Sequence, residues 1–173
     1  MITVLRLGHR KERDARVSTH CGLVARALGA SAVVYTGEKD PKLVESVKSV
    51  AKNWGGPFSV SYSESWRKEI KKYKKKGFAV VHLSMYGLPI QSIIRKIRKK
   101  KKILAVIGAE KVPGEVYRLA DFNVAVASQP HSEIAALAVF LHEYFAGKEL
   151  AKKFKRSKLK IIPQERGKLV ISK

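Results

Sequence analysis

Basic and histidine side chains gather where the first predicted strand ends, in the stretch LRLGHRKERDARVSTH. A helix follows the strand, and the carboxyl ends of strands are where α/β sheets bind ligands. Arg13, Arg16 and His20 recur at helical spacing and share one face of that helix. Cations at a helix N-terminus oppose the helix dipole, which favours a nearby anion such as phosphate. The alternative is a solvated basic start of a helix.

Proton transfer is the chemistry that this cluster could perform. Histidine is the better base at neutral pH, whereas an arginine normally stays protonated. An aspartate can orient an arginine through a bidentate contact. The candidates are therefore Arg16, Asp14, His20 and Arg10.

Two other predicted strands end in loops that carry little charge, VIGAEKVPGE and VASQPHSE. Each loop leads into a helix. Exposed backbone N–H groups at such helix starts can bind a carboxylate, a phosphate or an adenine edge. Ser132 could instead be a helix N-cap, and a single histidine such as His131 is more often structural. The pattern indicates a pocket formed by the two loops.

The common catalytic motifs are missing. The chain has no GxxxxGK[ST], GxGxxG, HExxH or GxSxG sequence, which excludes the usual P-loop, dinucleotide, zinc-protease and serine-hydrolase signatures. No histidine or cysteine group has zinc spacing, so we expect no metal site. With Cys21 as its single cysteine, the chain cannot form an internal disulfide. We expect a cytoplasmic protein, because neither a signal peptide nor a membrane span is recognisable.

The elements that carry these residues alternate between strand and helix about six times. Strands are predicted at ITVLRL, AVVYT, PFSVSYS, FAVVHLSM, KILAVIG and FNVAVA. This alternation is typical of an α/β fold, a mostly parallel sheet with helices on both faces. The last 23 residues differ, because LKIIPQERGKLVIS reads as a C-terminal β-hairpin appendage.

Positive charge identifies the class of partner. The chain has 36 Lys+Arg and 14 Asp+Glu, a formal net charge of +22, so a nucleic acid is the expected partner rather than a membrane. Basic residues cluster in residues 67–76, 95–102 and 152–160, beyond what helix dipoles require. The side chains expected to contact phosphates are Arg6, Arg10, Arg13, Arg95, Lys96, Arg98, Lys99, Lys152, Lys153, Lys155 and Arg156.

Three stretches carry a family resemblance: LRLGHRKERDARVSTH, VIGAEKVPGEVYRLADFNVAV and SQPHSEIAALAVFL. They resemble the three motifs of the archaeal tRNA cytidine-56 2′-O-methyltransferases, of the SPOUT class of trefoil-knotted methyltransferases. The resemblance runs from Met1 to about Gly147. It implies a C-terminal trefoil knot, a homodimer, S-adenosylmethionine as cofactor, and methylation in the T-loop of tRNA. It further implies a knotted domain over residues 1–150, and the pattern of the remaining residues, 151–173, indicates a basic extension with a hairpin.

The resemblance also implies which residues surround the cofactor. They are Leu83 after one strand, Gly108, Ala109, Glu110, Lys111, Val112 and Pro113 after a second, and Ala127, Ser128, Gln129, Pro130, His131, Ser132, Glu133 and Ile134 after a third. Two departures matter, because related enzymes carry an arginine where this chain has Leu23 and an asparagine where it has Ile134. The usual catalytic pair therefore cannot be transferred. Arg16 is the first candidate, because this class often assigns the role to an arginine, and it could face the cofactor of the other subunit.

Two competing functions remain open at this point. A non-catalytic RNA-binding α/β protein would explain the charge equally well, but it would not explain the two loops of low charge. A base methyltransferase of the same class would differ only in its product.

Overall fold

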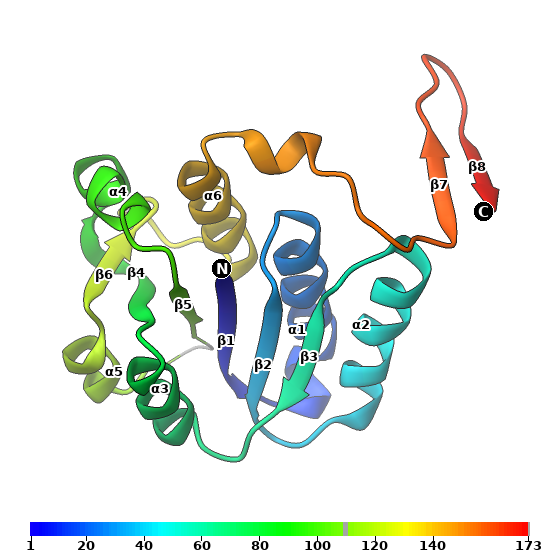
Figure 1. The fold of residues 1–173 in the computed structure, drawn as a ribbon. Coiled ribbons are helices and arrows are strands. Elements are labelled where there is room, and N and C mark those ends of the chain that lie inside the picture. Colours follow the sequence, from blue (N-terminus) through cyan, green and yellow to red (C-terminus); the bar gives the residue numbers. More distant parts are fainter. Residues whose placement is uncertain (109–110, 173) are drawn as a thin grey trace.

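A six-stranded parallel sheet forms the centre of the molecule in the computed structural model, which describes residues 1–108 and 111–172 (Figure 1). The strands are β1 (Ile2–His9), β2 (Ala32–Gly37), β3 (Ser59–Tyr62), β4 (Ala79–Pro89), β5 (Ile103–Ile107) and β6 (Phe122–Ala125). Their order is β3-β2-β1-β5-β4-β6, and every pairing is parallel. The predicted α/β class is confirmed.

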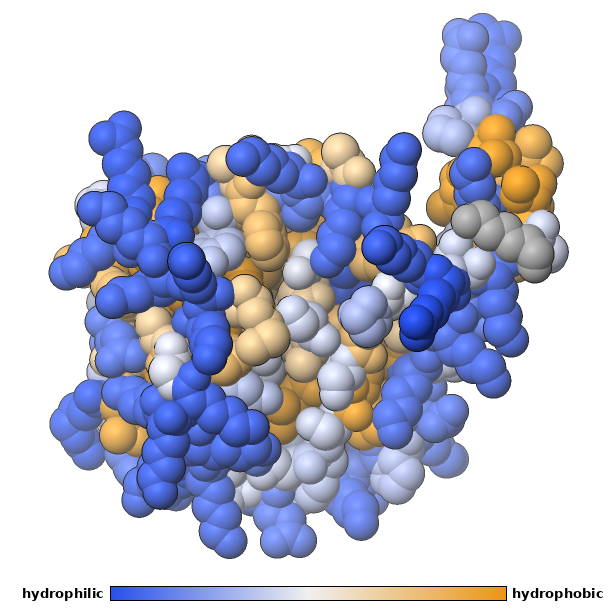
Figure 2. Space-filling model, viewed as in Figure 1, coloured by the Kyte–Doolittle hydropathy of each residue, from blue (hydrophilic) through white to orange (hydrophobic). Residues whose placement is uncertain are grey.

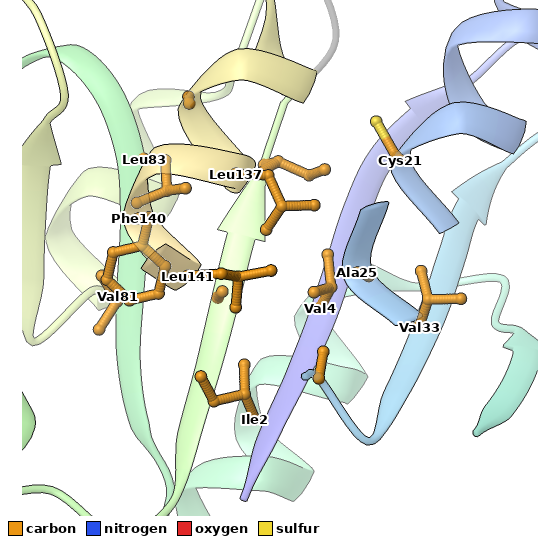
Figure 3. Close-up of a cluster of buried hydrophobic side chains, with 14 of the residues drawn as sticks. Ile2, Val4, Cys21, Ala25, Val33, Val81, Leu83, Leu137, Phe140 and Leu141 are labelled. Atoms are coloured by element: carbon orange, nitrogen blue, oxygen red, sulfur yellow. The ribbon is translucent and has the colours of Figure 1, made fainter. Parts of the chain in front are cut away.

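Helices cover both faces of the sheet. They are α1 (Lys11–Ala27), α2 (Pro41–Trp54), α3 (Trp66–Lys75), α4 (Ile90–Arg98), α5 (Gly114–Leu119) and α6 (Glu133–Phe145), and the 3-10 turn η1 (Lys148–Ala151) follows. One hydrophobic cluster joins α1, α2, α4 and α6 to one face of the sheet, and a second joins α3 and α5 to the other. Figure 3 shows the larger cluster, in which Leu137, Phe140 and Leu141 of α6 lie against the sheet.

Helix starts follow the local capping rules. Asp40 caps α2, because its Oδ1 accepts a hydrogen bond from the Leu43 backbone nitrogen at 3.1 Å, and Pro41 occupies the first turn. Ser132 caps α6, with its Oγ accepting from the Ile134 nitrogen at 3.0 Å. The Ser132 cap therefore fixes the start of α6 at the end of the loop that follows β6.

Strand β4 is longer than the sequence indicated, because it continues to Pro89. Its pairing with β6 breaks after Leu83 and resumes at Leu88, so the residues between arch away from the sheet. Gly87 allows the chain to return, since a Cβ there would lie 2.4 Å from the Val124 nitrogen. The strand pairings do not test the trefoil knot, which stays a prediction.

The chain after α6 crosses the molecule and ends in the predicted hairpin, β7 (Leu159–Ile162) and β8 (Leu169–Ser172), which pair antiparallel. The crossing segment is fixed to the end of α2: the Gly56 nitrogen donates to the Lys155 carbonyl at 3.1 Å, and the Lys158 nitrogen donates to the Asn53 carbonyl at 2.9 Å. Arg26 also lies 4.4 Å above the Phe154 ring.

The hairpin itself projects from the body, and Figure 2 shows its apolar side chains at the surface. The register places Ile161 opposite Val170 on one face and Ile162 opposite Leu169 on the other, so both faces are apolar. Ile161 is 60% exposed, so the cover that we expect for these side chains is not provided within the described chain. Whether residues 151–173 form a unit separate from residues 1–150 stays a prediction. Among the described residues, none of the helices has the length and hydropathy that crossing a membrane requires.

Candidate functional site

A cleft of about 660 Å³ opens at the carboxyl ends of β1, β4 and β5. Its lining comes from β1, the first turns of α1, the arch of β4, the loop after β5, helix α5 and the start of α6. The cleft lies where ligands bind in parallel sheets. Strands far apart in the sequence thus bring both predicted loops to one place.

Six of the residues expected around a cofactor line this cleft. They are Leu83, Gly108, Lys111, Val112, His131 and Glu133. The others that the structure describes lie outside the lining, namely Pro113, Ala127, Ser128, Gln129, Pro130, Ser132 and Ile134; of these, Ser132 is the cap of α6 and Ile134 packs against the core. Ala109 and Glu110 lie outside the described residues. Both loops therefore reach the cleft, but only some of the residues that we expected around the cofactor line it in each loop.

The backbone at Gly108 lies close to the side chain of Val112, which belongs to the same loop. A Cβ at this position would lie 2.1 Å from Cγ2 of Val112, so a side chain would displace the loop. The absence of a side chain keeps open the wall formed by Gly108, Val112 and Ile107.

Arg6 is built into the wall of the cleft, because only 1% of its surface is exposed. Its Nη2 lies 3.1 Å from Oε1 of Glu133, and its Nη1 donates to the Leu7 carbonyl. This ion pair fixes the start of α6 against the end of β1. Arg6 nevertheless lines the cleft, and its predicted contact with a phosphate stays a prediction.

Arg10 is held at the mouth of the cleft by Asp14. Arg10 Nε lies 2.9 Å from Asp14 Oδ2 and Nη2 lies 3.2 Å from Oδ1, the bidentate geometry of a strong carboxylate contact. The hydrogen bond from Arg10 and its positive charge hold the pKa of Asp14 below its ordinary value. Asp14 and Glu133 thus supply negative charge beside Arg10 and Arg6, and the binding of an external anion by this cluster stays a prediction.

Arg16 and His20, the other proposed catalytic side chains, lie on exposed positions of α1 and outside the lining of the cleft. Arg13, one turn before Arg16, does line it. Asp14 and Val17 of α1 line it as well, so the first two turns of the helix face the cleft of its own chain.

A polar network that was not predicted from the sequence lies behind the cleft. His82 is fully buried, its Nδ1 lies 2.9 Å from Asn123 Oδ1, and its ring packs edge-to-face on Tyr117 with centroids 4.5 Å apart. The Tyr117 hydroxyl in turn lies 2.9 Å from Ser84 Oγ. Burial lowers the pKa of His82 and keeps its ring neutral, and Nε2 has no hydrogen-bond partner among the described residues. A histidine within the apolar strand FAVVHLSM was the one available signal.

The predicted phosphate contacts other than Arg6 lie mostly on the surface. Arg95, Lys96, Lys99, Lys153, Lys155 and Arg156 are exposed. Lys152 Nζ lies 3.4 Å from the Gly29 carbonyl, and Arg98 donates to the Glu143 carbonyl from Nε at 2.7 Å. Their role in RNA binding stays a prediction. Within the described residues, no group of three or more acidic, histidine or cysteine side chains is placed to hold a metal ion.

Comparison with known proteins relates this architecture to a function. Residues 54–171 match the family described as tRNA ribose 2′-O-methyltransferase, aTrm56. A curated tRNA (cytidine(56)-2′-O)-methyltransferase of Methanopyrus kandleri is 52% identical over 96% of this chain and 94% of its own length. A protein of the same name from Pyrococcus abyssi is 54% identical over 99% of this chain and 87% of its own length.

Solved structures share the fold at much lower identity. The A. aeolicus TrmH/SpoU tRNA modifying enzyme has a TM-score of 0.63 at 16% identity, and the match covers 86% of this chain and 75% of that one. The SpoU methyltransferase AviRb from Streptomyces viridochromogenes, solved in complex with the cofactor AdoMet, has a TM-score of 0.60 at 15% identity, covering 86% and 57%.

Proposed function

Because the chain belongs to the family of tRNA ribose 2′-O-methyltransferases, we propose that it transfers a methyl group from S-adenosylmethionine to the ribose 2′-oxygen of cytidine 56 in tRNA. The family match carries the proposal, since the matched residues 54–171 include the arch of β4, the loop after β5 and the start of α6. Those segments form most of the lining of the cleft.

The cleft suits a cofactor of this size and chemistry. Its volume of about 660 Å³ lies in the ordinary range for small-molecule sites, roughly 300 to 1,000 Å³. Leu83, Ile107 and Val112 offer apolar surface for a nucleoside, and Gly108 lets the backbone approach it. His82 Nε2, which has no hydrogen-bond partner within the described residues, belongs to the same lining. Bound there, S-adenosylmethionine supplies an electrophilic methyl group.

The protein's contribution is to hold the acceptor ribose and to help its 2′-oxygen lose a proton. Orientation alone can supply much of the rate in such a transfer. Arg10 and Arg13 present positive charge at the mouth of the cleft, where a phosphate next to the target ribose would lie. Asp14 fixes Arg10 by two contacts and so determines where that charge sits.

A homodimer would give Arg16 and His20 a role that the single chain does not. Both are exposed on α1 and lie outside the lining of their own cleft, so the cleft of a second copy is where either could act. The apolar hairpin offers surface for such a contact. We include the homodimer and a cytoplasmic location, where tRNA is modified, in the proposal.

Thermal unfolding tests the cofactor assignment with little material. A ligand that binds only the folded chain raises its melting temperature. At a ligand concentration of a hundred times the dissociation constant, the free energy of unfolding rises by about 2.7 kcal/mol. We expect S-adenosylmethionine to raise the melting temperature and methionine alone to leave it unchanged. A melting temperature that ignores S-adenosylmethionine would favour the non-catalytic RNA-binding alternative.

A further inference from the structure

A second concave surface lies at the opposite end of the strands, and four of the nine residues that line it are lysines. Its volume is about 540 Å³, and its lining consists of Gly77, Phe78, Ala79, residues 99–102, Asp121 and Phe122. The end of α3 borders it, because Lys102 Nζ donates to the Lys76 carbonyl at 3.1 Å and Lys74 Nζ lies 3.3 Å from Asp121. We call this surface, with Lys74, Lys75 and Lys76, the lysine groove.

Residues 99–102 form a turn, which we call the lysine turn. Hydrogen bonds fix its backbone, although its side chains are exposed. The Lys100 carbonyl accepts from the Tyr144 hydroxyl at 2.7 Å, and the Lys101 carbonyl accepts from the Met1 nitrogen at 2.6 Å. The Lys102 carbonyl accepts from the Ala79 nitrogen at 3.0 Å. The turn therefore presents its charges in one place, and a partner that binds them does not have to order the backbone first.

The positive charge of the groove is not balanced by the protein. Among the described residues of its lining, Asp121 is the one carboxylate, and it already accepts from Lys74 and, at 2.7 Å, from the Val80 nitrogen. In the described part of the chain, Lys75, Lys99, Lys100 and Lys101 have no ion-pair partner. Two helix C-termini favour one or two cations each, so the excess calls for a polyanion.

The groove lies too far from the cleft for both to hold the same nucleotide. On β4, Ala79 lines the groove and His82 lines the cleft; along β5, Lys102 lines the groove and Ile107 lines the cleft. Three to five residues separate the two sites along these strands, which is roughly 10 to 17 Å at about 3.3 Å per residue. An anion in the groove therefore takes no part in chemistry at the cleft.

We propose that the lysine groove binds the phosphate backbone of the substrate tRNA at a point remote from the methylated nucleotide. This inference rests on the proposed function. Lysines are flexible point charges that bind phosphates without reading bases. The enzyme then favours a folded RNA that reaches both ends of the strands over a short stem-loop that fills only the cleft.

The test compares two charge reversals of equal size. Lys100→Glu with Lys101→Glu alters the groove, and Lys48→Glu with Lys52→Glu alters exposed positions of α2, at the other end of the sheet in Figure 1. We expect the groove variant to bind full-length tRNA about tenfold more weakly and to lose about one to two from its salt slope. Its affinity for a stem-loop that carries the target cytidine, its affinity for S-adenosylmethionine and its single-turnover rate at saturating tRNA should match the wild type.

Three results would overturn the proposal: unchanged tRNA affinity, an equal loss in the α2 variant, or an equal loss with the short stem-loop. Failure of the proposed function has a different signature, since the wild-type protein would then not methylate tRNA at all. The comparison of tRNA affinity between the two variants would still decide whether the groove binds RNA.

Discussion

At the scale of single residues, two of the three arginines that line the cleft are held by carboxylates. Arg6 is fixed by Glu133, and Arg10 is fixed by Asp14. Each pair joins the end of β1 or the start of α1 to its surroundings, so the positive charge is positioned before substrate arrives. Such preorganisation is what orientation-dependent catalysis requires.

Replacing Asp14 by asparagine tests this positioning. Asp14→Asn should lower the single-turnover methylation rate by about 10- to 100-fold, because Arg10 loses its charged partner and its fixed place. Cofactor affinity should change little. Glu12→Gln on the exposed side of α1 is the matched control and should retain the rate. A rate equal to wild type in Asp14→Asn would show that Arg10 needs no such partner.

The same carboxylate predicts a pH dependence of stability. Because the pKa of Asp14 is lowered in the folded chain, its stabilising contribution is complete above the unfolded value of about 4 and is lost as pH falls through the folded value. The free energy of unfolding, measured by denaturant titration at a series of pH values from 6 downwards, should therefore fall less steeply for Asp14→Asn than for the wild type. Parallel curves for the two proteins would contradict this.

Gly108 tests the assignment of the cleft. Gly108→Trp should abolish measurable S-adenosylmethionine binding by calorimetry, since a side chain at this position must displace the loop that forms the wall. Gly114→Trp is the control, because Gly114 is exposed, lies outside the lining and has only the end of Arg118 near it. Equal cofactor affinity in both folded variants would place the cofactor elsewhere.

At the scale of elements, the sequence predicted what local rules determine. Strand and helix alternation, the Asp40 cap with Pro41 and the closing hairpin are all written in short segments. The arch of β4 was missed because the predicted strand FAVVHLSM ended at Met85, and only the return of the chain to β6 shows the following residues as strand. The network of His82, Tyr117 and Asn123 joins positions about 40 residues apart, which periodicity cannot connect.

The hairpin has a testable role at this scale. Two isolated strands are marginal in water, and Ile161 and Leu169 leave apolar surface exposed on both faces. Deleting residues 157–173 should lower the melting temperature or shift sedimentation towards a smaller species. The shortened chain lacks the apolar surface through which we expect the hairpin to contact the rest of the protein or a second copy. If melting and sedimentation both stay as in the full chain, the hairpin is free.

At the scale of the whole molecule, dimerisation would combine an α1 helix of one copy with the cleft of another. Arg16→Ala and Gly108→Trp would then be defective in different parts of the same composite site. We expect each variant to be impaired alone and a mixture that has exchanged subunits to regain part of the activity. Mixtures that stay as inactive as the separate variants would restrict the site to one chain, with Arg10 rather than Arg16 at its centre.

The net charge of +22 belongs to the same scale, because it suits the chain to a partner as negative and as large as tRNA. Neither the cleft nor the charge identifies the modified atom, and the central claim is that this atom is the 2′-oxygen of cytidine 56. The direct measurement is nuclease digestion and mass analysis of tRNA after incubation with the protein and S-adenosylmethionine labelled in its methyl group. The account predicts one labelled methyl group on the ribose of cytidine 56, and none on a tRNA with 2′-deoxycytidine at that position. Label on a base, at another nucleotide, or on the 2′-deoxy substrate would contradict it.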